Sequence, residues 1–365
     1  MAHPQRNQTI TTYQLAAALL SMILGVGVMN LPRTLTVDIG TADGWISIIF
    51  GGVVITLQYV FVCHAFKKHN ISSIDQYSRK AFGVILSKAI SIMMAIYFLI
   101  LGGWQAVAMS EMIRYFLLEN TPHYVSIVTI ILLCAFGVYY SLPTIIRVAC
   151  FFLPISVVVL LFVLIVGFRD ASLLNIRPVA AEGLLPVLLN SRNGLQAFQG
   201  VEIILLLMAS LQKGVRPVKA GIGALLFSTL LYAMTYLIVV ATVGTVEVQM
   251  LTWPTITLTH ASESSLLFTE RADSFLITTW ILQFFLTSLL TLYAAVKLFK
   301  NVFSVKGNWL IIPATIGMIL IALWPQTTDD ITKVSEMQQY AFVGIFFLLP
   351  LLCYGVVSLK RKDSI

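Results

Sequence analysis

Apolar stretches of roughly 18 or more residues recur along the whole chain, and they constrain the fold more than any other feature. A hydrocarbon core about 30 Å thick is crossed by roughly 20 helical residues, whereas the core of a soluble domain requires no such stretches. Of the 365 residues, 58% are hydrophobic and only 11% are charged. The sequence therefore predicts an all-α integral membrane protein with many transmembrane helices.

Windows between charged clusters divide these stretches into ten predicted spans. The connections near 67–87, 168–182 and 244–272 are too short for an independent fold, so the chain 1–365 is predicted to be a single transmembrane domain. The spans lie near 11–35, 42–66, 88–117, 123–142, 145–167, 183–212, 217–243, 273–299, 309–324 and 336–359.

The positions of the basic residues predict the orientation of the chain in the membrane. If the N-terminus is inside, the loops and tails on that side hold 16 of the 23 Lys and Arg residues, as is typical of a cytoplasmic face. Both termini are therefore expected to be cytoplasmic. The net charge of +7 follows from this distribution, with attraction to anionic membrane lipid as an addition, and it gives no reason to predict nucleic-acid binding.

Two predicted spans are interrupted by glycine and polar residues. The first contains GVGVMNLP at 25–32, and the sixth contains NGLQAFQGVE at 193–202. Glycine lets a ligand approach the backbone closely, while Pro32 removes a backbone donor and biases Leu31 away from the helix. We therefore expect helices 1 and 6 to be broken near their middles.

The two interruptions occupy matching places in the chain. Five spans precede the second interrupted span and five begin with it, so residues 11–167 and 183–359 are predicted to form two repeats. An odd number of spans per repeat gives the repeats opposite orientations in the membrane. The sequence thus predicts two inverted five-helix repeats, each starting with a broken helix.

A broken helix exposes backbone groups at membrane depth, where protein, water or a ligand must satisfy them. Half-helix N-termini attract a carboxylate, and free carbonyls coordinate a cation or an ammonium group. The breaks therefore predict a ligand site. The alternative interpretation is that both are glycine kinks filled by neighbouring helices.

Polar side chains within the spans are further candidates for this site. Glu202 is the one acid placed deep in a predicted span, which favours a functional role, although it would equally tie the sixth helix to its neighbours. Gln105 lies mid-span beside paired glycines, and Thr287 and Thr291 share one face of the eighth span. These hydroxyls either face a ligand or bond their own backbone.

Catalytic and cofactor motifs are missing from the sequence. There is no phosphate-binding loop, no zinc-type His-Glu-x-x-His and no Gly-x-Ser-x-Gly elbow, and the cysteines lack metal-type spacing. We therefore expect neither an enzyme nor a bound cofactor or metal.

The pairing of GVGVMNLP with AFQGVE at 197–202 resembles the amino acid-polyamine-organocation transporter superfamily. Within it, the whole chain resembles the B subunit of spore germinant receptors, the spore germination permease family, through segments such as LPRTLT, DGWI, AMSEMIRYFLLENTP and SFLITTWILQFF. This resemblance implies a LeuT-like fold in the inner membrane of the bacterial spore. It also implies action with an A subunit and a lipoprotein C subunit, the B subunit sensing a nutrient that is often an amino acid.

The resemblance also implies which residues bind the ligand. The two breaks would hold its carboxylate and amino groups, and the third and eighth spans would supply walls. Thr287 and Ser288 resemble the hydroxyl pair that completes a sodium site in some related transporters, and coupling to sodium or to a proton is left open. The ligand residues implied are Gly25, Val26, Gly27, Leu101, Gln105, Phe198, Gln199, Gly200, Glu202, Thr287 and Thr291.

Two functions follow from the same predicted pocket. The first is a nutrient-sensing receptor subunit, in which the ligand favours one arrangement of the broken helices. The second is an ion-coupled secondary amino acid transporter that works by alternating access. Walls of Leu, Val and Phe around a small opening predict a small neutral amino acid as the ligand in either case.

Overall fold

The chain folds almost wholly into helices. The computed structural model describes residues 9–25, 27–180, 183–189, 191–261, 272–305, 307–325 and 328–362, and within these ranges it contains no β-strand. The elements in chain order are α1 (Thr12–Ile23), α2 (Gly27–Ile39), α3 (Gly44–Lys68), α4 (Ile74–Phe82), α5 (Val84–Phe116), α6 (His123–Val138), α7 (Leu142–Phe168), η1 (Leu173–Ile176), α8 (Leu184–Leu189), α9 (Arg192–Gln196), η2 (Val201–Ile203), α10 (Ile204–Leu207), η3 (Met208–Ser210), α11 (Pro217–Val243), α12 (Thr245–Met250), α13 (Pro254–Ala261), α14 (Ala272–Phe303), α15 (Ile311–Leu323), α16 (Thr328–Phe342), the π-helical η5 (Val343–Leu348) and α17 (Leu349–Lys362).

Six helices of the described chain are long and apolar enough to cross a membrane, which makes this an integral membrane protein. They are α3, α5, α7, α11, α14 and the continuous α16–η5–α17. The pair α1 and α2, bent by 47° at their junction, adds a seventh span if counted as one. Three shorter apolar helices cover His123–Val138, Val201–Ser210 and Ile311–Leu323. Every predicted span thus contains helix, and the number of crossings stays a prediction.

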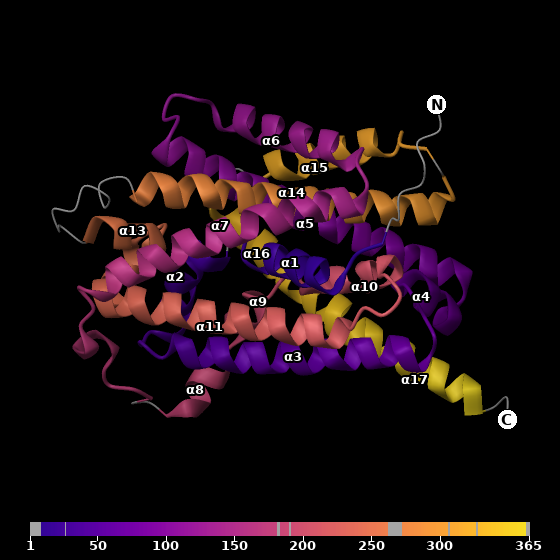
Figure 1. Ribbon diagram of the computed structural model, residues 1–365, viewed down its shortest axis with the longest axis horizontal. Helices are drawn as coiled ribbons and strands as arrows, with labels where there is room; N and C mark the ends of the chain where they lie inside the picture. Colours follow the sequence, from indigo (N-terminus) through magenta and orange to yellow (C-terminus); the bar gives the residue numbers. More distant parts are fainter. Residues whose placement is uncertain are drawn as a thin grey trace.

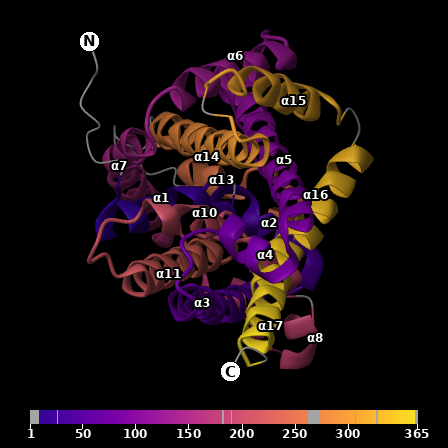
Figure 2. The same cartoon turned by 90° about the vertical axis from the view of Figure 1, so that its right-hand side faces the viewer.

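The long helices lie side by side, with the short helices α1 and α10 among them and α8 at the edge (Figure 1). Viewed from one end of the bundle, α1 and α10 lie in the interior, with α5, α7, α11 and α14 around them (Figure 2). All four residues of α10 are at most 2% exposed. The two predicted breaks therefore sit in the core of the bundle, where only other parts of the protein or a ligand can reach their backbone groups.

The predicted connections hold helices that a hydropathy window does not detect. In the 67–87 segment, α4 starts at Ser73, whose side chain accepts from the Gln76 N–H, and ends at Gly83. It buries Ile74, Tyr77, Ser78 and Ala81, which share one face. A nine-residue amphipathic helix has too low a mean hydropathy to resemble a span, so it was predicted as loop.

The expected effect of Pro32 on α2 was wrong. Leu31 is helical, and α2 continues through Pro32 to Ile39. A proline leaves the carbonyl four residues earlier without its N–H partner. That carbonyl, on Val28, instead accepts from Thr255 Oγ1 at 2.8 Å, so a side chain from α13 replaces the missing backbone donor.

The packing of α11 on α3 generates the first prediction. A Cβ added at Gly221 would overlap the Tyr59 ring, which is fully buried and held by a 3.0 Å bond from its hydroxyl to Pro217 O. Gly223, two residues along the same helix, faces open space. We expect Gly221→Ala to destabilise the protein by about 1–3 kcal/mol through overpacking, and Gly223→Ala to leave stability unchanged or slightly raised. Thermal unfolding in detergent, followed by size-exclusion chromatography, measures both; equal melting temperatures would contradict this packing.

Candidate functional site

The first interruption leaves backbone carbonyls at the end of α1, because the last turn of a helix has no N–H partners for them. Three of these carbonyls accept from side chains of other helices in the fully buried core. The pairs are Thr287 Oγ1 with Ser21 O at 3.0 Å, Trp280 Nε1 with Gly25 O at 2.7 Å, and the Tyr232 hydroxyl with Ile23 O. The break is therefore held by α11 and α14.

The second interruption is a tight turn that a carboxylate stabilises. Gly200 has φ 108°, a left-handed conformation that glycine alone adopts at little cost. Its N–H donates to Glu202 Oε2 at 2.8 Å, and the Tyr97 hydroxyl donates to Glu202 Oε1 at 2.9 Å. Glu202 is fully buried. The two oxygens of Glu202 thus stabilise the turn and connect it to α5.

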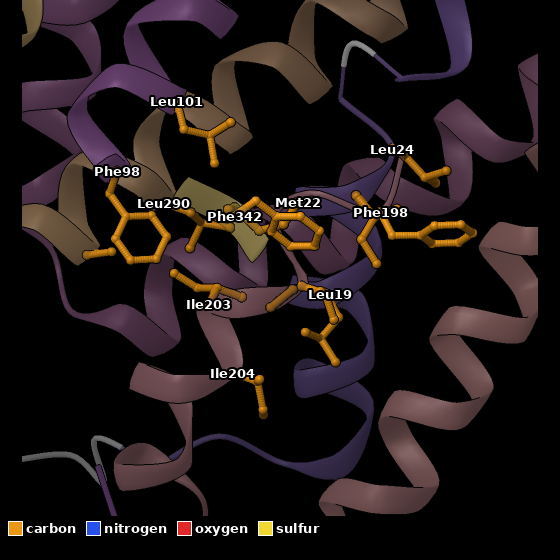
Figure 3. Packing of buried hydrophobic residues seen from close by; sticks show 14 of the residues in the cluster. Leu19, Met22, Leu24, Phe98, Leu101, Phe198, Ile203, Ile204, Leu290 and Phe342 are labelled. Atoms are coloured by element: carbon orange, nitrogen blue, oxygen red, sulfur yellow. The ribbon is translucent and has the colours of Figure 1, made fainter. Parts of the chain in front are cut away.

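The two interruptions contact each other. A Cβ at Gly200 would lie 2.8 Å from Met22 O. The turn at Gly200, in the sixth predicted span (183–212, called the sixth segment below), is therefore in direct contact with the end of α1. Figure 3 shows Met22 and Leu19 of α1 beside Phe198 and Ile203 of the sixth segment within one apolar cluster. A shift in either break would therefore displace the other.

A cavity of about 150 Å³ lies next to the breaks. One face each of α2, α5 and α9 reaches it, with residues spaced at i, i+3 and i+4, and α16 closes it. The lining residues are Ile23, Gly27, Asn30, Leu31, Thr34, Leu101, Trp104, Gln105, Asn193, Gln196, Ala197, Gln199, Ser335 and Gln338. A cavity of this volume accommodates a small organic molecule.

Three polar atoms of this lining are buried and have no hydrogen-bond partner in the described chain. They are Asn30 Oδ1, Gln105 Oε1 and Gln338 Nε2. Leaving a buried polar atom unpaired costs about 1–3 kcal/mol, so the cavity favours an occupant that both donates and accepts hydrogen bonds. Among the described residues, no Asp, Glu, Lys, Arg or His lines it.

The predicted site residues divide into two groups around this cavity, and Val26 lies outside the described residues. Gly27, Leu101, Gln105 and Gln199 line it directly. Gly25 adjoins it, because a Cβ there would lie 3.0 Å from Gln105 Oε1 and 3.1 Å from Thr287 Oγ1. The residues packed behind the lining are Phe198, Gly200, Glu202, Thr287 and Thr291.

The residues behind the lining have protein partners of their own. The Phe198 ring meets the Tyr232 ring edge to face at 5.8 Å between centroids. Thr291 Oγ1 donates to Ser288 O at 2.9 Å, three residues earlier on the same helix. Glu202 connects to the cavity indirectly, since Gln199 Nε2 donates to the Tyr97 hydroxyl at 3.0 Å.

Sequence reasoning missed much of the polar lining. Asn30, Trp104, Asn193, Gln196, Ser335 and Gln338 line the cavity without having been assigned a site role. The adjacent glutamines at 338 and 339, at the start of an apolar span, were a usable signal: uncharged polar side chains there are expensive unless they face a partner or a cavity.

The described residues contain no group of three or more His, Cys, Asp or Glu side chains that could hold a metal. The hydroxyl pair at Thr287 and Ser288 does not converge on one point. Thr287 Oγ1 bonds Ser21 O of α1, whereas Ser288 Oγ bonds Gly102 O of α5 at 3.1 Å. The two hydroxyls therefore join different helices.

Comparison of the sequence with known proteins finds spore germination proteins each time. The model of a family described as "Spore germination protein" matches residues 9–331. Spore germination protein A2 of Bacillus subtilis (strain 168) is 32% identical over 362 residues, covering 99% of both chains. Spore germination protein YndE of the same organism is 30% identical and covers 97% of both chains, and GerLB of Bacillus cereus is 23% identical.

Solved structures with a similar architecture have the LeuT fold. A Na⁺-coupled sialic acid symporter superposes with a TM-score of 0.67 at 12% identity, covering 92% of this chain and 77% of its own. MhsT in complex with L-phenylalanine superposes with a TM-score of 0.65 at 11% identity, covering 96% and 99%. The architecture is thus of the transporter type.

The carboxylate contacts generate the second prediction. Glu202→Gln replaces one acceptor oxygen with an amide donor, so either the Gly200 N–H or the Tyr97 hydroxyl loses its acceptor. We expect a loss of about 1–3 kcal/mol of stability, seen as a lower melting temperature in detergent. The matched control is Glu111→Gln on the same helix as Tyr97, where the side chain is only partly buried. Equal effects of the two substitutions would remove the special role of Glu202.

Proposed function

Because this chain belongs to the spore germination protein family, we propose that it is the nutrient-sensing subunit of a spore germinant receptor. It binds an amino acid in the cavity between α2, α5, α9 and α16 and signals to partner subunits. The observation that carries the proposal is that three residues lining one cavity beside both interruptions each have a buried polar atom without a partner in the described chain. They supply hydrogen bonds that a zwitterion requires.

The ligand's charged groups have complementary surroundings in this cavity. Gly27 begins α2 and lines the cavity, so the positive end of a 13-residue helix faces the space. In the proposed complex, the carboxylate of the ligand lies at this N-terminus of α2. The ammonium donates to Gln105 Oε1 and Asn30 Oδ1, the two unpaired acceptors.

The proposal includes the finer architecture. The chain crosses the membrane ten times as two inverted repeats, 11–167 and 183–359, whose first helices are broken. It lies in the inner membrane of the spore with both termini on the cytoplasmic side, and it acts with an A subunit and a lipoprotein C subunit. The membership of the family and the LeuT-type neighbours support this arrangement.

A chain of hydrogen bonds offers a route from the cavity to the breaks. Gln199 lines the cavity, donates to the Tyr97 hydroxyl, and Tyr97 donates to Glu202, which holds the Gly200 turn. A ligand that repositions Gln199 biases this turn and, through its contact with Met22, the end of α1. The size of the response equals the difference in ligand affinity between the two arrangements.

An ion-coupled amino acid transporter is the second candidate, favoured by the fold shared with a Na⁺-coupled symporter. Both functions use the same pocket. Accumulation of substrate in proteoliposomes under an ion gradient supports transport, whereas saturable binding without accumulation supports sensing.

The closeness of Gly25 to two site residues generates the third prediction. In nanodiscs, a panel of radiolabelled amino acids should include one that binds saturably to the wild type. We expect Gly25→Ala to weaken that binding at least tenfold, because the added methyl group meets Gln105 and Thr287. Gly355→Ala on α17, where a Cβ meets nothing, is the matched control. Unchanged affinity in the Gly25 variant would overturn the placement of the ligand.

A further inference from the structure

The cavity has two chemically different walls. The wall from the end of α1, α2 and α5 contains Ile23, Leu31, Leu101 and Trp104 beside its two unpaired acceptors. The opposite wall, from α9, the turn after it and α16, is polar except for Ala197. It consists of Asn193, Gln196, Gln199, Ser335 and Gln338. The sequence predicted walls of Leu, Val and Phe, whereas among the described residues that line the cavity there is Leu but neither Val nor Phe.

The polar wall is a connected surface of amide and hydroxyl groups. Gln196 Nε2 donates to Ser335 Oγ at 3.4 Å, Gln339 Nε2 donates to Asn193 Oδ1 at 3.1 Å, and Gln199 Nε2 donates to Gln338 O at 3.4 Å. Gln338 is 2% exposed, and its Nε2 has no partner. The wall therefore presents a buried donor that the protein itself leaves unused.

We propose that the ligand is an amino acid whose side chain is uncharged and forms hydrogen bonds, through a carboxamide or a hydroxyl group. This deepens the function proposed above and rests on it. With the carboxylate at the start of α2, the side chain faces the polar wall. An apolar side chain would leave Gln338 Nε2 unpaired, and a charged one would find no counter-charge among the lining residues.

Isosteric ligand pairs test this directly. Threonine and valine differ by a hydroxyl against a methyl group, and asparagine and aspartate differ by a neutral against a charged end. Binding of all four, radiolabelled, is measured on the full chain in nanodiscs. We expect asparagine to bind at least tenfold more tightly than aspartate, and threonine at least tenfold more tightly than valine, because a site built to hydrogen-bond a ligand rejects the analogue that lacks the group.

Substitution of the polar wall provides the matched comparison. Gln338→Leu and, separately, Asn193→Ala should reduce the preference for threonine over valine to less than threefold. Gln76→Leu, on the exposed face of α4 and far along the chain from this wall, should retain it. Two variants at different helices keep the test decisive if one of them does not fold.

The outcomes separate this inference from the function on which it rests. Tighter binding of valine than of threonine, or of aspartate than of asparagine, overturns this inference. The proposed receptor or transporter function is not affected by that result. Absence of binding for every amino acid in the panel overturns both.

A different observation bears on ion coupling. The fold is shared with a Na⁺-coupled symporter, and a sodium site of the kind suggested by Thr287 and Ser288 would need free carbonyls of the first helix. In this chain the carbonyls of Ser21, Ile23 and Gly25 accept from Thr287, Tyr232 and Trp280. The indole N–H at 2.7 Å from Gly25 O presents a positive dipole where a cation would approach.

From these contacts we infer that the described carbonyls at the end of α1 and the hydroxyls of α14 do not form a sodium site. At a break with free carbonyls, a cation would satisfy the carbonyl oxygens. Here the side-chain donors of Thr287, Tyr232 and Trp280 satisfy them instead. Ser288 contributes nothing to such a site, since its hydroxyl bonds Gly102 O on another helix.

Direct measurement of sodium binding tests this inference without any knowledge of the ligand. Radiolabelled sodium is added to the purified wild type and to Thr287→Val, with the Na⁺-coupled sialic acid symporter as the positive control. We expect no saturable binding to the wild type that excess unlabelled sodium displaces. Saturable sodium binding that is lost in Thr287→Val would overturn the inference. This result does not depend on the outcome of the amino acid binding experiments.

Discussion

The structure depends on satisfying the backbone carbonyls at the end of α1. In an apolar bundle no water is available to hydrogen-bond these carbonyls. Each carbonyl without a hydrogen-bond donor would lower the stability of the fold by several kcal/mol. Tyr232 and Trp280 reach them from two helices far along the chain. These aromatic residues thereby hold α11 and α14 against α1, while the long helices also pack on one another, α14 on α5 and α11 on α3.

In the sixth segment, the unsatisfied backbone group is an N–H, and its hydrogen-bond partner is close in the sequence. Here the chain turns through Gly200, and the donor left by the turn is satisfied locally by Glu202, two residues on. Tyr97 then anchors the carboxylate. One break is thus held by distant donors acting on carbonyls, and the other by a near acceptor acting on an N–H. Because the Gly200 turn presses on Met22, the two solutions form one unit.

Much of this could be predicted from the sequence, and the rest could not for physical reasons. Long apolar runs locate helices because their length and composition are local properties, and the glycine motifs at 25 and 200 lie where short helical segments meet, while two broken membrane spans stay a prediction. Pairings across the chain are not local: nothing near Pro32 indicates that Thr255 supplies the donor for Val28 O. The amide lining was missed for the same reason.

The hydrogen bonds at the breaks are compatible with the proposed change of arrangement on ligand binding. Each contributes a net of about 0.5–1.5 kcal/mol, so exchanging a few of them costs only a few kcal/mol. A ligand bound with a micromolar dissociation constant supplies about 8 kcal/mol. Reversing a 1:99 equilibrium between two arrangements requires about 5.5 kcal/mol of differential affinity. Gln199 lines the cavity and is linked through Tyr97 to Glu202, so under the proposed function about two thirds of such a binding free energy would be needed to move both breaks.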